Sequence, residues 1–386
     1  MSLKVLMVLP AYLPESLGGA EKQAHIFSRG LRRRGVPVSI LAPQERPVGK
    51  VEEIDESGVH VRRVNVTRYP WYGGRYMLSF LYWTVAVVVW MLRRRHDFNV
   101  VYIYHARLHA VGPVIAARLL GVPVVAKLGR GGEDFDLTPV RRKKLIGRVC
   151  YPIVRDGIDR FLANSTDMLA DLEAHGISAQ RTWRIPNGVE IPAEVSRSIA
   201  RPDDEGLVEF VYTGRLALEK RLDVLLEAFA RLGGGGWRLT LVGDGPLEQE
   251  LRDQVAALEM SDCVIFTGRV ENVPKYLVAS HFFISASESE GMSNSLLEAI
   301  SHGTVPVVSR VSGVDDIVTD GETGLVFRAN DVDALAVALR RAVTMSAEAR
   351  ALLGERCREQ ARVRFSIEAV VRAVQTKLEG LVARTG

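Results

Sequence analysis

Short apolar runs, separated by amphipathic segments, recur along the whole chain. Seven runs in the first half have the length and composition of buried strands: residues 4–9, 36–41, 59–66, 99–104, 122–128, 160–164 and 182–185. The second half repeats the pattern: residues 208–212, 238–242, 264–267, 282–285, 306–309 and a last run within 321–327. Most of these runs lack polar alternation, which is typical of parallel sheets covered by helices on both faces.

Helical spacing of apolar residues fills the intervals between the runs. The clearest example is the segment 221–232, which carries Leu222, Leu225, Leu226 and Phe229 on one face. The same spacing occurs in other segments: one that ends at Gly35, residues 334–343 and residues 367–381. Strand–helix units without a run of consecutive hairpins predict an α/β protein with two doubly wound, Rossmann-like domains.

The length of 386 residues also exceeds what one hydrophobic core usually supports. Apolar content falls between residues 191 and 206, where Pro192, Pro202 and an acidic triplet occur. We therefore predict a first domain at 1–192, a linker at 193–206 and a second domain at 207–366. The C-terminal helix, about 367–386, is expected to pack back on the first domain.

The most hydrophobic segment, residues 76–92, has seventeen residues, fewer than the roughly 20 that span a bilayer. We expect a helix that is buried or docks on a surface. The aromatic and cationic stretch 69–76 before it fits either a membrane interface or half-exposed core residues. Three basic clusters lie in the first half: residues 32–34, 93–95 and 141–144.

The net charge of +4 is mild, but its clustering favours an anionic membrane surface or an anionic substrate. For any single cluster taken alone, however, a solvated helix end is the better explanation. No base-reading motif accompanies the clusters, so we expect no nucleic-acid partner. Three scattered cysteines without metal-ligand spacing, and an apolar N-terminus that runs into Pro10, indicate the cytoplasm, with the inner face of the membrane as a further expectation.

Glycines and cations follow several predicted strands, where a parallel sheet binds its ligands. Gly18 and Gly19 lie between the first strand and a helix, an arrangement that can hold a diphosphate. In the second half Gly214 is followed by Arg215 and Lys220 at the start of another helix. Two cations and free N–H groups around one point can neutralise a diphosphate.

The stretch from Glu290 to Glu298 joins another predicted strand to a helix start. Gly291 allows a close approach of the backbone, and Ser293 or Asn294 can cap the helix. Because carboxylates repel phosphate, Glu290 and Glu298 are expected to accept hydrogen bonds from sugar hydroxyls. Taken alone, the nine residues fit an acidic, capped packing helix as well as a nucleotide-sugar site.

On the first domain, His105, Arg130 and Asp134 follow predicted strands and are candidates for contact with a second substrate. Each also fits a loop residue that meets only water. No Asp-x-Asp pair sits at a strand end, so we expect no bound metal and no cofactor apart from a nucleotide-sugar co-substrate.

Together these motifs resemble, in order and spacing, the retaining glycosyltransferase family 4. The resemblance rests on Gly214-Arg215 with Glu219-Lys220, on residues 243–246, on residues 290–299 and on residues 303–307. Gly18 to Glu21 and residues 186–189 are similar to the family's N-terminal pattern. The resemblance implies the GT-B fold, in which two Rossmann-like domains face an inter-domain cleft, and metal-independent transfer from a nucleotide sugar.

Residue roles are also implied by the resemblance. Arg215 and Lys220 would stabilise the donor diphosphate, Glu290 would hold the sugar hydroxyls, and Glu298 would bind the ribose. Other positions would contact the donor: Gly18, Gly19, Gly214, Arg269, Val270, Gly291, Met292, Ser293, Asn294, Ser295 and Leu296. The chain departs from the family at Gly129, where many members have a histidine, and we take His105 as the substitute catalytic candidate.

We therefore predict a hexosyltransferase that moves a sugar from a UDP- or GDP-sugar to a hydroxyl acceptor. A lipid-linked glycan in polysaccharide or glycolipid assembly is the expected acceptor. A nucleotide-sugar epimerase, a glycan phosphorylase and a non-catalytic carbohydrate-binding protein stay as alternatives on the same fold. No suitable cofactor lysine supports a phosphorylase, and a binding scaffold would rarely retain Arg215, Lys220, Glu290 and Glu298 together.

Overall fold

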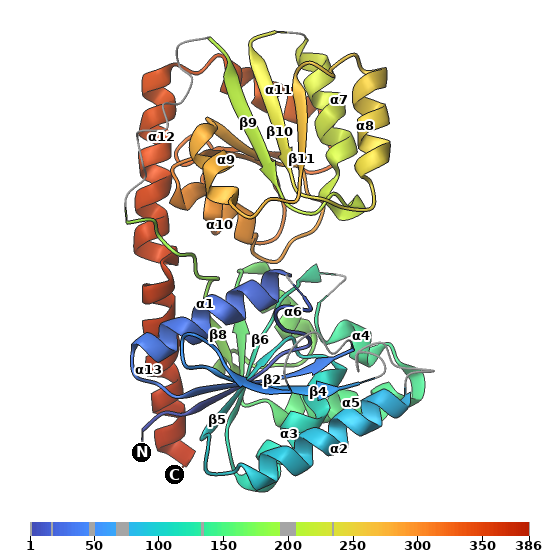
Figure 1. Cartoon of the computed structure of the whole chain (residues 1–386), viewed down its shortest axis with the longest axis vertical. Helices are drawn as coiled ribbons and strands as arrows, with labels where there is room; N and C mark the ends of the chain where they lie inside the picture. The colour runs from blue at the N-terminus through green and yellow to red at the C-terminus, as the bar shows by residue number, and fades with distance from the viewer. Residues whose placement is uncertain are drawn as a thin grey trace. The chain divides into compact units, whose positions relative to one another are not determined.

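The chain folds into two α/β units in the computed structural model, each built on its own sheet (Figure 1). The structure describes residues 2–16, 18–45, 51–66, 77–132, 135–193, 206–233 and 235–385. The first unit comprises Met1–Gly188 and Ile367–Gly386, and the second comprises Val189–Ser366. Of the predicted linker 193–206, only residues 193 and 206 are described.

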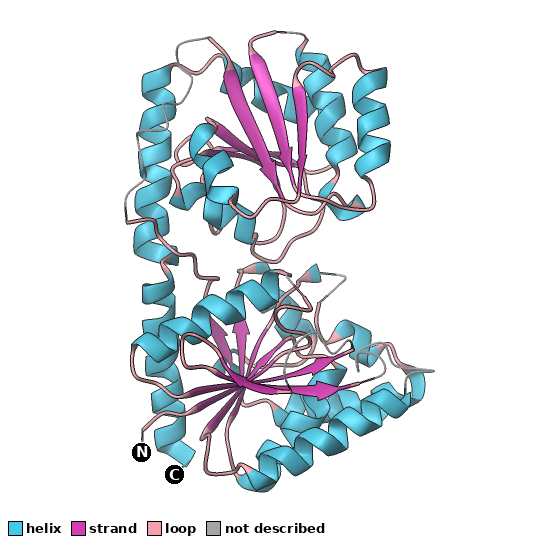
Figure 2. Ribbon diagram, viewed as in Figure 1, coloured by secondary structure: helices cyan, strands magenta, loops and turns pink. Residues whose placement is uncertain are grey.

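The first unit contains a sheet that fans out between helices (Figure 2). In the described residues this sheet has eight strands in the order β3-β4-β2-β1-β5-β6-β7-β8. All neighbouring strands are parallel except β3 and β4. The strands are β1 (Val5–Val8), β2 (Val38–Gln44), β3 (Glu52–Ile54), β4 (His60–Asn65), β5 (Val100–Tyr104), β6 (Val124–Lys127), β7 (Arg160–Ala163) and β8 (Thr182–Arg184). Strand order reverses between β1 and β5, which marks the point where such sheets bind ligands.

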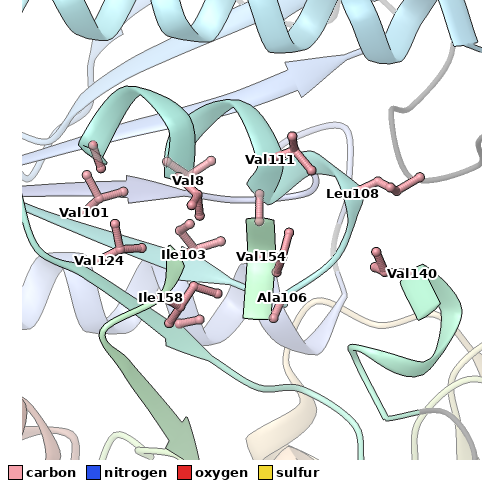
Figure 3. Packing of buried hydrophobic residues seen from close by; sticks show 14 of the residues in the cluster. Val8, Val101, Ile103, Ala106, Leu108, Val111, Val124, Val140, Val154 and Ile158 are labelled. Carbon is pink, nitrogen blue, oxygen red and sulfur yellow. The ribbon is translucent and has the colours of Figure 1, made fainter. Parts of the chain in front are cut away.

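Helices cover both faces of this sheet. One layer packs its apolar side chains on residues such as Val8, Val101, Ile103 and Val124 (Figure 3). It consists of α2 (Met77–Arg93), α3 (Val111–Leu120), α4 (Thr138–Arg141), α5 (Lys144–Gly157) and α6 (Asp167–Ala174). The opposite face is covered by α1 (Gly19–Arg33) and α13 (Ile367–Thr385). The apolar runs therefore bury alternate residues on opposite faces, as expected for a parallel sheet between helices.

The last helix belongs to the first unit although it is distant in sequence. α1 and α13 pack together, and a Cβ at Gly30 of α1 would lie 2.6 Å from Val371 Cγ2 of α13. Gln23 of α1 also holds the end of the unit, because its side chain donates to Gly188 O at 2.8 Å and accepts from Gly188 N at 3.1 Å. These contacts tie residues 367–385 and the chain near residue 188 to α1.

The second unit has a six-stranded parallel sheet of order β11-β10-β9-β12-β13-β14. Its strands are β9 (Val208–Thr213), β10 (Trp237–Val242), β11 (Val264–Gly268), β12 (Phe282–Ser285), β13 (Val305–Arg310) and β14 (Leu325–Arg328). One face carries α7 (Leu222–Leu232), α8 (Glu248–Ala257) and α11 (Val332–Val343). The other carries α9 (Val273–Ala279), α10 (Asn294–Ser301) and α12 (Ala347–Gln360).

Three shorter helical segments adjoin the α-helices. The 3₁₀ turns η2 (Leu108–Ala110) and η6 (Leu218–Lys220) precede α3 and α7, and the π-helical η7 (Ala361–Phe365) follows α12. In the second sheet the order again reverses beside the first strand of the unit, here between β9 and β12. Loops after these two strands are thus the expected ligand loops.

The predicted fold class is confirmed: both units are doubly wound α/β structures with parallel sheets. The sequence missed β3, which pairs antiparallel to β4 at the edge of the first sheet. Glu52 and Ile54 in β3 are exposed, so this three-residue strand lacks the apolar run that identifies buried strands. The predicted helix 76–92 corresponds to α2, which extends to Arg93, and residue 76 lies outside the described residues.

Candidate functional site

Loops at the carboxyl ends of three strands of the second unit lie against one another. Gly214 N after β9 donates to Val242 O at 3.0 Å, and Leu216 N donates to Asp244 O at 2.8 Å. Gly243 N after β10 donates in turn to Gly268 O of β11 at 2.9 Å. Backbone hydrogen bonds therefore fix the relative positions of the three loops, independently of their side chains.

Glycines are required where these loops meet. A Cβ at Gly243 would lie 1.9 Å from Gly214 O, and φ of Gly243 is 137°. Tyr212, buried in β9, donates its hydroxyl to Arg215 O at 2.8 Å, and burial raises its pKa far above the usual range. The neutral phenol thus holds the backbone of the loop that carries Arg215.

Lys220 and Glu290 form an ion pair, as Lys220 Nζ donates to Glu290 Oε1. Lys220 ends η6 after β9, whereas Glu290 follows β12, the neighbouring strand. Ser287 Oγ donates to the same carboxylate oxygen at 3.0 Å, and Glu288 N donates to Glu219 O at 3.1 Å. The two residues that the sequence assigned to phosphate and sugar therefore lie together at the switch point of this sheet.

The start of α10 lies directly beyond Glu290. Ser293 caps the helix, because its Oγ accepts from Leu296 N at 3.4 Å, and it lies 3.1 Å from Ser295 Oγ. Gly291 is buried, and its carbonyl oxygen would lie 2.2 Å from a Cβ at Gly313. This packing presents a capped helix N-terminus next to Glu290, where N–H groups and the helix dipole favour an anionic ligand.

The other predicted donor residues of this unit divide into buried and accessible positions. Met292, just before α10, and Leu296, within α10, are buried in the apolar cluster on this face of the sheet. Asn294, Ser295 and Glu298 are half-buried on α10. Met292 and Leu296 can thus offer only backbone atoms, and the three polar side chains can meet a ligand.

Two of the predicted cations are exposed. Arg215 follows Gly214 at the end of β9, and in the described part of the chain its guanidinium has no hydrogen-bond or ion-pair partner. Arg269 follows β11, and the adjacent Val270 is half-buried against the apolar cluster that includes α10. Arg215 therefore extends from the same loop as Lys220, with its charge available to an anion.

Sequence reasoning missed Arg221, which follows Lys220 with φ of 48° in the left-handed region. Its guanidinium pairs with Asp223 at 3.0 Å and with Glu288 at 3.5 Å, and it also donates to Asn330. Nothing in the local sequence distinguishes this arginine from its neighbours. It connects the loops after β9, β12 and β14 and so positions Lys220.

In the first unit, Gly18 and Gly19 begin α1 at the carboxyl end of β1, as predicted from the sequence. Both are exposed. Glu21 in the first turn accepts from Ser16 Oγ at 3.0 Å, and its Oε2 would lie 2.5 Å from a Cβ at Gly18. This helix start therefore already has a carboxylate beside it, which competes with any bound phosphate.

His105 follows β5 and pairs with a fully buried carboxylate. Its Nδ1 lies 3.0 Å from Asp136 Oδ2, and φ of His105 is 64°. Asp136 also accepts from Arg107 Nε at 3.2 Å and from Gly129 N at 2.9 Å. Burial alone raises the pKa of Asp136, but the charges of His105 and Arg107 and these hydrogen bonds outweigh it and lower the pKa to about 2.

The ionised Asp136 fixes the orientation of the histidine ring. A carboxylate can only accept, so His105 Nδ1 carries a hydrogen and donates it to Asp136. In the described residues Nε2 has no hydrogen-bond partner. The side chain of His105 is 18% exposed, so this nitrogen is available to a hydroxyl group at the carboxyl edge of the sheet.

Gly129, which follows β6, makes room for this ring. A Cβ at position 129 would lie 1.8 Å from His105 Cε1 and 2.4 Å from Nδ1. Such distances are far inside van der Waals contact, so no side chain fits at 129 while His105 keeps this position. Arg130 is exposed and has further interactions, and Asp134 lies outside the described residues.

Lys127 is a candidate that the sequence analysis did not single out. It ends β6, and burial lowers its pKa to about 7. Its Nζ lies 5.9 Å from the ring centroid of Tyr104, whose own buried hydroxyl has no hydrogen-bond partner in the described residues. In the sequence, the signal that could have identified Lys127 was a lysine at the end of an otherwise apolar strand.

His109 is buried as well, with its Nε2 2.8 Å from Tyr104 O, and burial lowers the pKa of His109 to about 3.

Metal-binding geometry is absent from the parts of the chain that the structure describes, since no three His, Cys, Asp or Glu side chains gather there. The second unit instead offers two cations, a helix N-terminus and a carboxylate. This combination can bind the phosphates and the hydroxyl groups of one ligand. The first unit offers the imidazole of His105, held by Asp136.

Two family models match the chain. The model described as Glycosyl transferases group 1 matches residues 196–363, and the model described as Glycosyl transferase 4-like domain matches residues 18–188. A GDP-mannose-dependent alpha-mannosyltransferase of Mycobacterium tuberculosis (strain CDC 1551 / Oshkosh) is 28% identical over 336 residues, which cover 84% of this chain and 83% of that protein.

Solved structures resemble the chain over nearly its whole length. Sucrose-phosphate synthase from Thermosynechococcus elongatus aligns with a TM-score of 0.80 at 19% identity and covers 99% of this chain and 100% of its own. HepE of Anabaena, crystallised with UDP and glucose, aligns with a TM-score of 0.78 at 19% identity and covers 98% of this chain and 100% of its own. At this identity the two structures support the fold.

Proposed function

The chain belongs to the GT-B glycosyltransferases of family 4 type, and we propose that it is a retaining, metal-independent enzyme that glycosylates a lipid-linked acceptor. As a glycosyltransferase it uses a nucleotide-sugar donor. A UDP- or GDP-sugar is the proposed donor. The lipid-linked acceptor is proposed to lie at the inner face of an anionic membrane.

The observation that carries the proposal is the Lys220–Glu290 pair beside the start of α10. The donor diphosphate would bind Arg215, Lys220 and the N–H groups of α10, since these positive groups lie at one edge of the sheet. Lys220 would exchange part of its pairing with Glu290 for the phosphate. Glu290 would then accept hydrogen bonds from the sugar hydroxyls, which gives the pair a role before and after donor binding.

Transfer would break the bond between the anomeric carbon and the diphosphate oxygen and form one to the acceptor oxygen on the same face of the sugar. The departing diphosphate oxygen would take the proton of the acceptor hydroxyl. Arg215 and Lys220 would stabilise the negative charge that develops on the leaving group. Such a route needs no protein nucleophile and no metal ion. Its product keeps the anomeric configuration of the donor.

Donor binding tests the first part of the proposal. UDP or GDP is expected to raise the Tm of the wild-type protein by mass action, and Lys220→Ala is expected to remove most of that shift. Gly380→Ala on α13 is the matched control, because a Cβ there would meet nothing within 4 Å. If neither nucleotide shifts the Tm, or if Lys220→Ala shifts it equally, the assignment of the diphosphate site is wrong.

The stereochemistry is tested on the product. Nuclear magnetic resonance of the first-formed glycoside is expected to show the anomeric configuration of the donor, and transfer is expected to continue in the presence of a chelator. An inverted product contradicts the retaining mechanism, and loss of turnover that is restored by a divalent ion contradicts metal independence.

A further inference from the structure

Helix α2 has two apolar faces, although only one of them packs on the protein. Phe80, Trp83, Val87 and Met91 are buried in the core of the first unit, and Trp83 Nε1 donates to His109 O at 2.9 Å. The opposite face carries six large apolar side chains with exposed fractions between 38% and 81%: Leu78, Leu81, Tyr82, Val85, Val89 and Leu92. At about 100° per residue, these six fall within an arc of about 100°.

The exposed stripe is too regular for scattered surface residues. Its spacing repeats the pattern of a core-facing helix, over a length of about 21 Å at 1.5 Å per residue. No charged residue occurs between Met77 and Leu92. Contiguous exposed apolar surface of this kind marks an interaction site in a folded protein. The buried face anchors α2 in the first unit, so its axis lies along the surface of that unit.

The positive charge of this region favours an anionic partner. Residues 77–157 contain thirteen lysines and arginines against five aspartates and glutamates, a net charge of +8, whereas the whole chain has +4. Arg93, Arg94 and Arg95 follow the stripe directly and are exposed. Arg94 pairs with Asp97 at 3.3 Å, which leaves the cluster positive.

Helix α5 adds the same combination of groups in the same layer. Leu145 and Val149, one turn apart, are 79% and 62% exposed, and Arg141, Lys144 and Arg148 beside them are exposed as well. Contacts with α3 connect α2 and α5 on one face of the sheet. Their outer sides therefore both point away from that face.

We propose that the outer side of α2, continued by α4 and α5, docks on an anionic lipid bilayer, with the stripe inserted at the level of the headgroups and the arginines on the lipid phosphates. An apolar helix face with cations at its end is the pattern of an interfacial helix. In the described residues no helix is long and apolar enough to cross a membrane. Docking would hold the proposed lipid-linked acceptor near the first unit, so the inference rests on the proposed function for its purpose.

Vesicle flotation of the full chain tests the docking surface. Wild-type protein is expected to float with vesicles of phosphatidylglycerol and phosphatidylcholine, and at least tenfold less with phosphatidylcholine alone. The variant Leu78→Ser/Val85→Ser is expected to lower the partition coefficient about tenfold or more, since both side chains are largely exposed in the free protein. Arg93→Gln/Arg95→Gln is expected to lower it about fivefold for each charge.

A matched control lies on α11, where Val337 is 55% exposed and Arg340 is exposed. Val337→Ser/Arg340→Gln is expected to float like the wild type. Equal flotation with both vesicle types, or flotation unchanged in the α2 variants, overturns the proposal. So does a wild-type dimer in size-exclusion chromatography that Leu78→Ser/Val85→Ser dissociates without any vesicle binding, because the stripe is then an interface between copies.

A second readout separates this inference from the proposed function. Hydrolysis of the donor without acceptor is expected to be equal in the wild type and in both α2 variants, whereas transfer to a vesicle-embedded acceptor falls with flotation. If flotation behaves as expected but no sugar is transferred to any lipid-linked acceptor, the docking surface stands and the proposed acceptor class is wrong. If transfer to the vesicle-embedded acceptor is unaffected in variants that no longer float, the docking surface stands, and the proposed role of docking in holding the acceptor is wrong.

Discussion

Replacing Gly129 with alanine should displace the ring of His105. The added Cβ would lie 1.8 Å from Cε1, 2.4 Å from Nδ1 and 2.9 Å from Nε2 of that ring. Ordinary contact between such atoms begins near 3.5 Å, so the ring has to move by roughly 1.5 Å or more. A movement of this size breaks the 3.0 Å hydrogen bond from Nδ1 to Asp136.

The expected loss of stability follows from that hydrogen bond. Asp136 is fully buried and ionised, and among the described residues it would keep Arg107 and the N–H of residue 129 as donors. Loss of one donor to a buried charged group is worth roughly 1.5–3 kcal/mol. A value of about 2 kcal/mol corresponds to a fall in the Tm of the first unit of roughly 4–8 °C.

Thermal and urea unfolding of the full chain measure the effect. Gly380→Ala serves as the control substitution, because a Cβ there would meet nothing within 4 Å. In a double-mutant cycle, Gly129→Ala should add less than about 0.5 kcal/mol to the effect of His105→Ala, since the group that it displaces is already gone. A Gly129→Ala protein as stable as Gly380→Ala, or fully additive effects in the cycle, would refute the packing argument.

Two further predictions concern charged groups. Lys220→Ala and Glu290→Gln are each expected to lower kcat/KM about 100-fold or more. The double variant should be little worse than either single variant, because the two side chains act as a pair. Additive losses in steady-state kinetics would contradict this expectation. Burial lowers the pKa of Lys127 from 10.5 to about 7, so between these values the unfolded chain holds more protons and stability rises with pH. Lys127→Met is therefore expected to raise the Tm at pH 6–7, and this gain in Tm should disappear toward pH 10.5. A gain in Tm that does not depend on pH would contradict the prediction.

Strand positions could be predicted from the sequence because buried parallel strands are short, apolar and separated by helical spacing. The predicted run 282–285 coincides with β12, and the predicted run 208–212 differs from β9 only at its end. Loops after such strands gather at one edge of a sheet. The proximity of Lys220 and Glu290 therefore follows from strand order, once β9 and β12 are known to be neighbours.

The partners and the burial of individual side chains could not be predicted from the sequence in the same way. No local signal shows that Arg221 adopts a left-handed conformation or that Lys127 has no anionic partner among the described residues. Both depend on which side chains other loops bring close. The short exposed strand β3 shows the same limit for secondary structure, because pairing with β4 at the sheet edge overrides its weak local pattern.

At position 129, the family motif and the packing in the structure lead to different conclusions about the imidazole of the site. Compared residue by residue, the chain lacks the histidine that many family members have after this strand. In the structure, β5 and β6 are neighbours, and the first residue after β5 places its imidazole within 1.8 Å of where a side chain at 129 would begin. The left-handed φ of His105 and its hydrogen bond to Asp136 hold the ring there. The imidazole of His105 therefore keeps this position at the edge of the sheet only while residue 129 is a glycine.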